Sequence, residues 1–228
     1  MEQQKQKSAN ARNFQKELDK ILGQITVPPR LLLHSCCAPC SSYVLEYLRR
    51  YFEITVLYYN PNISMEAEYQ KRVEEQKRLI EVYNQLPDSG LPISIIEGDY
   101  EPEAFYGIAK GLEQCPEGGG RCFACYELRL RKTAELARKS GQDYFATTLT
   151  ISPLKNAAKL NEIGERLSQE YHVPWLPSDF KKKNGYKRSI ELSVEYGLYR
   201  QNYCGCVYSV KNTEERKGQR SSPGMLIY

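Results

Sequence analysis

Short apolar runs alternate with helix-like segments along this chain, and this alternation restricts its fold more than any other feature. The runs that we expect to form strands lie at 31–33, 54–59, 93–96, 144–149 and 173–176. Each is followed by a segment whose apolar residues recur at helical spacing. About five such repeats favour a parallel sheet with helices on both faces. We therefore predict an α/β, Rossmann-like (HUP-type) doubly wound fold.

Capping residues indicate where several of the helices begin. Ser64 is the expected N-cap of a helix over 64–85, because its hydroxyl can accept a hydrogen bond from a free backbone amide. Ser152 and Pro153 have the composition of another helix start. The last helix is expected to begin near Ser189.

The predicted fold also places a group of polar residues at one edge of the sheet. Cys36, Cys37, Asp99 and the segment 150–156 each follow a predicted strand. In doubly wound sheets, ligands bind beyond the carboxyl ends of the strands. We therefore expect these residues to gather around one site.

Composition and charge are those of a globular protein. The 228 residues include 32 Lys and Arg against 28 Asp and Glu, so 32 − 28 leaves a net charge of +4. No apolar run reaches the roughly 18 to 20 residues of a membrane span, and the first residues are polar. We expect a cytoplasmic protein without membrane contact. Its predicted parts are a polar, helical arm at 1–27, an α/β domain at 28–210 and a polar tail at 211–228.

The cysteines carry the clearest chemical signal. Cys36, Cys37 and Cys40 lie close together, and Cys122 and Cys125 form a distant second group. Thiolates from two separate turns can complete a four-coordinate sulfur site for zinc or for an iron–sulfur cluster. A CxxC pair can also be a redox dithiol, and buried free thiols are the structural alternative.

Cys204 and Cys206, separated by Gly205, form a different arrangement. Two thiols one residue apart can close a small, strained disulfide, and glycine permits the required backbone bend. Such a bond is easily reduced, which suits a redox role. The same two cysteines could instead complete the metal site. Cys115 has no patterned partner and receives no role.

Several motifs follow one another in a characteristic order along the chain. They are HSCCAPC at 34–40, YYNPNI at 58–63, RCFACYELRL at 121–130, TTLTISPLKN at 147–156 and YCGC at 203–206. Together they resemble the QueH-type epoxyqueuosine reductases, and the likeness extends over about residues 31–209. Members of that family reduce the epoxide of epoxyqueuosine in tRNA to the cyclopentene of queuosine, independently of cobalamin.

The resemblance implies specific roles for the cysteines. It implies a [4Fe-4S] cluster held by Cys36, Cys37, Cys122 and Cys125, and a redox-active disulfide between Cys204 and Cys206. It also implies an additional iron ion. Some relatives carry Asp at the position of Cys40, which makes Cys40 the candidate ligand of that iron.

Epoxide reduction also requires protons and an external electron donor. Two electrons and two protons are consumed when the epoxide oxygen is removed. The candidate proton donors are Tyr59, Asp99 and His34, although each of these residue types more often has a structural role. We retain Tyr59 and Asp99 as catalytic candidates together with Cys204 and Cys206.

A tRNA partner requires clustered positive charge. The candidate RNA-binding residues are Arg129, Arg131, Lys132, Lys155, Lys181, Lys182, Lys183, Lys187 and Arg188. The alternative for these cations is an ordinary solvated helix face or loop. Exposed tyrosines near the site could stack on unpaired bases.

Three other functions compete with this hypothesis. The first is a zinc-stabilised tRNA-binding module without catalysis, which would be colourless, whereas an iron–sulfur protein is brown. The second is an ATP-using tRNA-modifying enzyme, but no glycine-rich phosphate loop follows the first predicted strand. The third is a thioredoxin-like oxidoreductase, which is disfavoured because the CxxC at 122–125 follows a glycine-rich turn.

Overall fold

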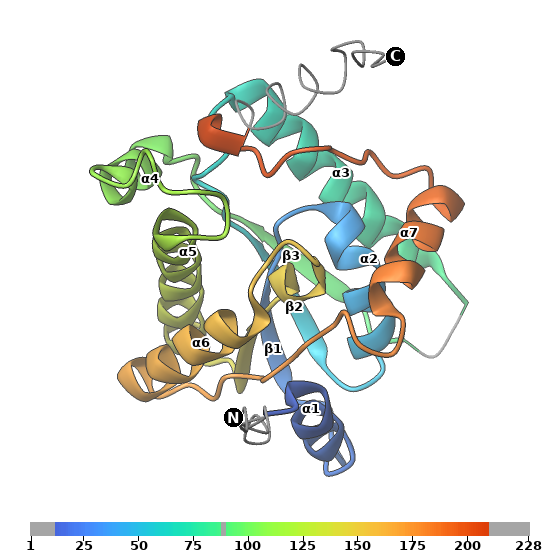
Figure 1. The fold of residues 1–228 in the computed structure, drawn as a ribbon. Helices are drawn as coiled ribbons and strands as arrows, with labels where there is room; N and C mark the ends of the chain where they lie inside the picture. Colours follow the sequence, from blue (N-terminus) through green and yellow to red (C-terminus); the bar gives the residue numbers. More distant parts are fainter. Residues whose placement is uncertain (1–11, 88–89, 210–228) are drawn as a thin grey trace, which may run out of the picture.

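A parallel sheet forms the centre of the molecule in the computed structural model, which describes residues 12–87 and 90–209. The sheet has four strands in the order β3-β2-β1-β4 (Figure 1). They are β1 (Arg30–His34), β2 (Glu53–Tyr58), β3 (Ile93–Glu97) and β4 (Tyr144–Thr147). β1 is central, since Leu31 pairs with Ile54 of β2 and with Tyr144 of β4. The predicted α/β, Rossmann-like fold is confirmed.

Helices cover both faces of this sheet (Figure 1). They are α1 (Phe14–Leu22), α2 (Ala38–Leu48), α3 (Glu66–Gln85), α4 (Pro102–Ala109), α5 (Gly120–Lys139), α6 (Ala157–Tyr171) and α7 (Gly185–Glu195). A 3-10 helix, η1 (Thr148–Ile151), follows β4 directly. α2 packs against α3 and α7, whereas α5 packs against α6.

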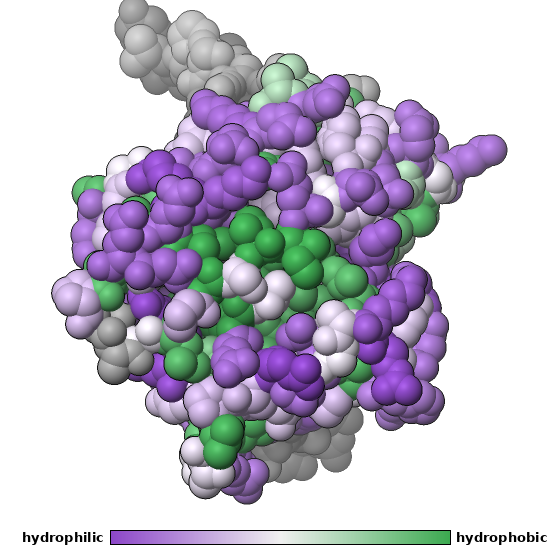
Figure 2. All heavy atoms as spheres, turned by 180° about the vertical axis from the view of Figure 1, so that it is seen from behind, coloured by the Kyte–Doolittle hydropathy of each residue, from purple (hydrophilic) through white to green (hydrophobic). Residues whose placement is uncertain are grey.

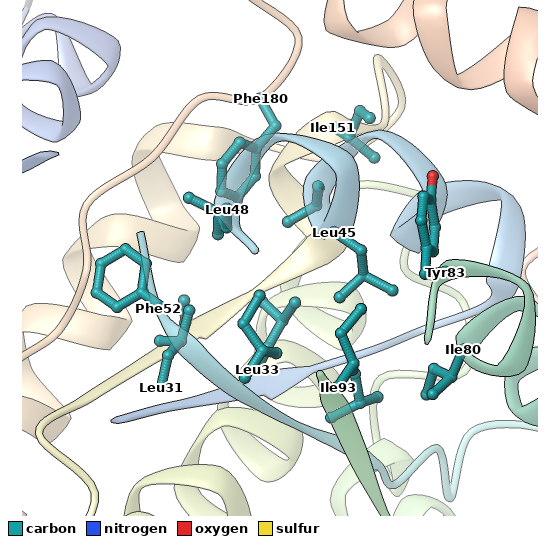
Figure 3. Close-up of a cluster of buried hydrophobic side chains, with 14 of the residues drawn as sticks. Leu31, Leu33, Leu45, Leu48, Phe52, Ile80, Tyr83, Ile93, Ile151 and Phe180 are labelled. Carbon is teal, nitrogen blue, oxygen red and sulfur yellow. The ribbon is translucent and has the colours of Figure 1, made fainter. Parts of the chain in front are cut away.

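The sequence of β1 explains why the core has two halves. Successive side chains of a strand point to opposite faces. Leu31 and Leu33 are buried with residues of α2 and α3, where Figure 3 shows them facing Leu45, Leu48 and Ile80. Leu32 is buried on the other face with residues of α5 and α6. An apolar run in this strand therefore supplies both layers of the core.

The predicted N-terminal arm contains one described helix. α1 begins after Asn13, whose side chain accepts a hydrogen bond from the amide of Lys16. Leu18 and Leu22 of α1 are buried in the same core as Leu31 and Leu33. The predicted tail at 211–228 lies outside the described residues, and the three-part division of the chain stays a prediction.

The fifth predicted strand, at 173–176, was wrong. This segment forms a single parallel bridge between Trp175 and Phe145 of β4, with two backbone hydrogen bonds. Pro174 and Pro177 explain why it ends there, because proline has no amide proton for a longer ladder.

Two predicted helix starts were also wrong. α3 begins at Glu66 after Met65, and the hydroxyl of Ser64 instead donates to the carbonyl oxygen of Gly205. α6 begins four residues after Pro153, at Ala157, where the Asn156 side chain accepts a hydrogen bond from the amide of Lys159. In both cases tertiary contacts or a better cap decide the boundary. The start predicted near Ser189 was wrong as well, since α7 begins at Gly185.

The outer surface combines polar and apolar areas. Figure 2 shows the side opposite to that of Figure 1, where apolar residues line a hollow that hydrophilic residues surround. Among the described helices, none has both the length and the apolar composition needed to cross a bilayer.

Candidate active site

The turn from β1 into α2 brings three thiols together. Cys36 follows β1, Cys37 is the N-cap of α2 with an extended backbone, and Cys40 lies in the first turn of that helix. The Sγ atoms of these three residues all lie within 4.8 Å of one another. Those of Cys36 and Cys37 are 3.8 Å apart. The group has the spacing and the soft donor atoms of a metal site.

Hydrogen bonds among these thiols concentrate negative charge on Cys37. The thiols of Cys36 and Cys40 both donate to its sulfur, which holds the pKa of Cys37 well below its ordinary value. Donating to Cys37 raises the pKa of Cys36 to about 11, and hydrogen bonds with Cys36 and Cys37 raise that of Cys40. A bound metal ion would displace the remaining protons.

Arg129 of α5 places a positive charge behind these thiols. Its side chain is 1% exposed, Nε donates to the carbonyl oxygen of Cys125 at 3.2 Å, and Nη1 donates to Oδ1 of Asn60 at 3.4 Å. None of the described ion pairs gives this guanidinium a carboxylate. Burial alone would lower the pKa of Arg129, but nearby sulfur atoms outweigh burial and raise it. These atoms belong to Cys125, Cys204 and Cys36.

A cavity of about 220 Å³ opens in front of the thiols. Its sulfur-bearing lining residues are Cys36, Cys37, Cys40 and Cys204. Its charged lining residues are Arg72, Arg129, Lys155, Arg200 and Glu117. With four cations against one carboxylate, the cavity suits an electron-rich or anionic group.

The segment after α7 closes one side of this cavity. It runs past α3 toward α4 (Figure 1). The amide of Ser64 donates to Gly205 O at 3.1 Å, and Nη1 of Arg72 donates to Cys204 O at 3.2 Å. The Sγ of Cys204 lies 3.5 Å from Nζ of Lys155 and 3.8 Å from Nδ2 of Asn62.

Cys204 and Cys206 occupy different surroundings. Cys204 lines the cavity, whereas Cys206 is 8% exposed and packs in an apolar cluster with Cys125 and Phe105. A hydrogen bond from the Cys206 thiol, followed by the charges of Lys155 and Arg129, holds the pKa of Cys204 well below its ordinary value. The same hydrogen bond raises the pKa of Cys206. Both are free thiols here, as are the other six cysteines.

Cys122 and Cys125 lie in the first two turns of α5. The amide of Gly118 donates to Sγ of Cys122 at 3.3 Å, and burial raises the pKa of Cys125 to about 11. Neither sulfur belongs to the group formed by Cys36, Cys37 and Cys40. Cys122 and Cys36 pack against the same core cluster. The charge of Arg129 interacts with both Cys125 and Cys36. The four-cysteine cluster ligation stays a prediction.

The candidate proton donors lie outside the lining of this cavity. The hydroxyl of Tyr59 donates to Oε2 of Glu101 at 2.9 Å, and Asp99 is exposed. His34 is fully buried, with ring nitrogens bonded to Thr147 Oγ1 and to the Tyr59 carbonyl, and burial lowers its pKa to about 3. His34 is thus a neutral structural residue. The catalytic roles of Tyr59 and Asp99 stay predictions.

Most of the predicted RNA-binding cations already have protein partners. Arg131 pairs with Glu127 and Glu170, Lys132 lies over the Tyr59 ring, Lys181 pairs with Asp179, Lys183 with Asp19, Lys187 with Glu191, and Arg188 with Glu46. Lys182 is exposed. Arg129 and Lys155 instead line the cavity. RNA contacts by these residues stay predictions.

Sequence reasoning missed two cations of the cavity. Arg72 lies on α3, where its pairing with Glu68 at 2.7 Å resembles an ordinary helix ion pair. Arg200 had one available signal, its position just before the YCGC motif. Motif spacing alone does not show that these residues face the thiols.

Comparisons with known proteins agree with the motifs. The family described as "Epoxyqueuosine reductase QueH" matches residues 31–212. Curated relatives with that name include a Staphylococcus epidermidis protein, 46% identical over 86% of this chain and 84% of its own length. One from Streptococcus pyogenes is 45% identical over 86% of this chain and 76% of its own. One from Thermotoga maritima is 34% identical over 84% and 95%.

Proposed function

Because this chain belongs to the epoxyqueuosine reductase QueH family, we propose that it reduces the epoxide of epoxyqueuosine in tRNA to the cyclopentene of queuosine. One observation carries this proposal beyond the family assignment. The sulfur atoms of a three-thiol turn and of Cys204 line a single cavity at the carboxyl end of the central strand. Such a cavity suits reductive chemistry, since cysteine thiolates are the usual ligands of electron-transfer clusters. The reaction is proposed to need no cobalamin.

The donor atoms and charges fit an iron–sulfur centre. Three thiols within 4.8 Å form a soft, anionic donor set. The buried Arg129 needs negative charge nearby, because a buried cation without compensation is costly. We assign the cluster to Cys36, Cys37, Cys122 and Cys125, and the additional iron to Cys40. When bound, these groups would supply single electrons and a Lewis acid.

The side chains of the cavity have their own tasks in this reaction. The cations Arg129 and Lys155 stabilise negative charge that develops as the epoxide opens, because they act in a largely buried site. Leu149 and Ile151 provide the apolar part of the wall and exclude water. Cys204 and Cys206 are assigned to the return of electrons from an external donor, through a disulfide that forms between them.

We infer that the anticodon approaches over the open side of the cavity. Arg200 and Tyr186 are exposed and belong to the cavity lining. A guanidinium can bind a phosphate, and a tyrosine ring can stack on an unpaired base. Leu154, which is 67% exposed, adds an apolar contact beside them.

The test is anaerobic purification followed by iron, sulfide and zinc analysis and by turnover with tRNA that carries epoxyqueuosine. Nucleoside mass spectrometry should show queuosine formed in the presence of a reductant. Cys37→Ser should lose iron and at least about 10²-fold of the activity, because a metal ligand is removed. Cys115→Ser is the matched control and should keep both, since Cys115 lies outside the thiol group.

Two results would count against the proposal. The first is a wild-type protein that holds zinc alone and leaves the modified nucleoside unchanged, as a non-catalytic binding module would. The second is equal loss of iron in Cys37→Ser and Cys115→Ser, because Cys37 would then not be distinguished as an iron ligand.

A further inference from the structure

The two sulfur atoms of the 204–206 pair differ in their access to the cavity. Cys204 belongs to the cavity lining. Cys206 is 8% exposed and lies among Phe105, Ala109 and Cys125. A reagent that enters the cavity therefore meets Cys204 first.

A buried ammonium group accompanies only one of these sulfurs. Nζ of Lys155 lies 3.5 Å from Sγ of Cys204 and 4.0 Å from a carboxylate oxygen of Glu117. The Lys155 side chain is only 9% exposed, although Lys155 lies in the loop that leads into α6. Because lysine is a mobile surface residue in most proteins, this buried position beside a sulfur requires a specific interaction.

We propose that an external dithiol reduces the 204–206 disulfide by attacking Cys204, that Cys206 is the leaving sulfur, and that Lys155 is the positioning residue for Cys204. This inference rests on the redox role proposed for the pair. Lys155 attracts the incoming thiolate and holds the Cys204 thiolate once it is released. Its ammonium faces the sulfur of Cys204, and the RNA contact predicted for it from the sequence stays a prediction.

The exchange balances with a dithiol as the only co-reactant. Its thiolate attacks Sγ of Cys204, the bond between the two cysteine sulfurs breaks, and Cys206 leaves as a thiolate. The second thiol of the donor passes its proton to Cys206. The resulting donor thiolate attacks its own sulfur in the mixed disulfide, which closes the donor disulfide and releases Cys204 as a thiolate. Two electrons and one proton have then moved to the protein.

The charge environment agrees with this final state. Cys206 donates a hydrogen bond to Cys204, and Lys155 and Arg129 add positive charge beside Cys204. The charged and titratable groups that face Cys204 come from four neighbouring elements: Lys155 before α6, Arg129, Cys125 and Tyr126 on α5, Arg72 on α3 and Cys36 after β1. Among these cations, Lys155 is the one whose charged atom is within hydrogen-bond distance of the sulfur.

The test is the pH profile of alkylation in the reduced, full-length protein purified anaerobically. Iodoacetamide is the probe, and mass spectrometry of the peptide 201–211 distinguishes the two cysteines. Cys204 should react at least about tenfold faster than Cys206. In Lys155→Met, the midpoint of the Cys204 profile should move upward by about one pH unit, which is about tenfold less thiolate at lower pH. Lys155→Arg should retain most of the wild-type profile.

Lys139→Met is the matched control. It removes an ammonium group from the far end of α5, and it should leave the Cys204 profile unchanged. Faster alkylation of Cys206, or an unchanged midpoint in Lys155→Met, would overturn the inference. Disulfide mapping of the oxidised protein separates the two proposals. Absence of a 204–206 link would refute the redox role itself, whereas a link with equal alkylation rates would refute only the inference.

Discussion

Gly205 shows how a single residue shapes the redox segment. Its φ of +109° lies in a region that side chains rarely adopt, and its carbonyl accepts hydrogen bonds from the amide and hydroxyl of Ser64. A Cβ at this position would lie 2.9 Å from Cγ1 of Ile63. The glycine therefore fixes the bend that separates the two cysteines, one toward the cavity and one toward the apolar cluster.

We expect Gly205→Ala to lower the free energy of unfolding by about 1–3 kcal/mol, because alanine is strained at this φ and its methyl group has no room. Urea denaturation measures this change. Gly107→Ala is the control, since a Cβ on this α4 residue meets nothing within 4 Å. It should stabilise the protein by about 0.5–1 kcal/mol, as alanine does in a helix. The same sign for both variants would contradict this account.

At the scale of elements, one carboxylate connects α3 to the segment after α7. Oε1 of Glu75 accepts from Nη2 of Arg78 at 2.8 Å and from the amide of Tyr199 at 2.7 Å. The hydrogen bond from Arg78, with that from the Tyr199 amide, lowers the pKa of Glu75 from its ordinary 4.5. Glu75 thus helps to hold the chain that continues to Cys204.

The stability of the protein should depend on this carboxylate at low pH. Because the folded-state pKa of Glu75 is lowered, its contribution is present above about pH 4.5 and is lost as pH falls through the folded-state value. Glu75→Gln should be less stable than the wild-type protein by about 1 kcal/mol at pH 7. Its free energy of unfolding should also fall less steeply as the pH is lowered. Thermal unfolding between about pH 3 and pH 7 measures the stability of both proteins across this transition.

Glu74→Gln serves as the control because Glu74 is 68% exposed and its described ion pair, with Lys77, lies at the surface. Its effect should stay within about 0.5 kcal/mol. If the stability of wild-type protein and of Glu75→Gln depended on pH in the same way, the stabilising role assigned to the Glu75 carboxylate would be refuted.

The elements themselves could be predicted wherever apolar spacing determines them. β1 to β4 fall within or next to the expected runs, because each needs apolar residues on both faces of a covered sheet. The run at 173–176 has the same composition but is interrupted by prolines. The start of α6 depends on the side chain of Asn156, and the sequence offers Ser152 and Pro153 as an equally good signal. Local patterns do not decide between competing caps.

The site was less predictable than the fold. The three thiols near β1 followed from motif spacing and from the expected edge of the sheet, whereas the position of Cys204 on the same cavity did not. The environment of Lys155 did not, because it depends on a contact between residues that are distant in sequence. The same holds for Arg188 of α7, because only the folded chain reveals its acidic partner Glu46 on α2.

At the scale of the whole molecule, the arrangement of charge matters more than its sum. The net charge is only +4, and many surface cations face carboxylates. Arg200 is exposed at the cavity, donates to Oγ of Ser193 and takes part in none of the described ion pairs. It is available for a phosphate of the substrate RNA.

We expect Arg200→Ala to weaken binding of the tRNA anticodon arm about tenfold at low salt and to reduce the slope of log affinity against log salt by about one. Arg138→Ala, an exposed change near the end of α5, is the control and should alter neither value appreciably. Fluorescence anisotropy at several salt concentrations gives both. An unchanged slope in Arg200→Ala would place the RNA elsewhere.

The position of β1 in the middle of the sheet also affects the order in which a growing polypeptide can assemble. β1 acquires its second neighbour only when synthesis has reached β4, and the cavity gains its last wall with residues 200–209. In a nascent chain that ends at α7, residues 200–209 therefore do not yet cover Cys36, Cys37 and Cys40 in the turn between β1 and α2. A metal ion bound by that turn would meet the least steric obstruction before translation is complete.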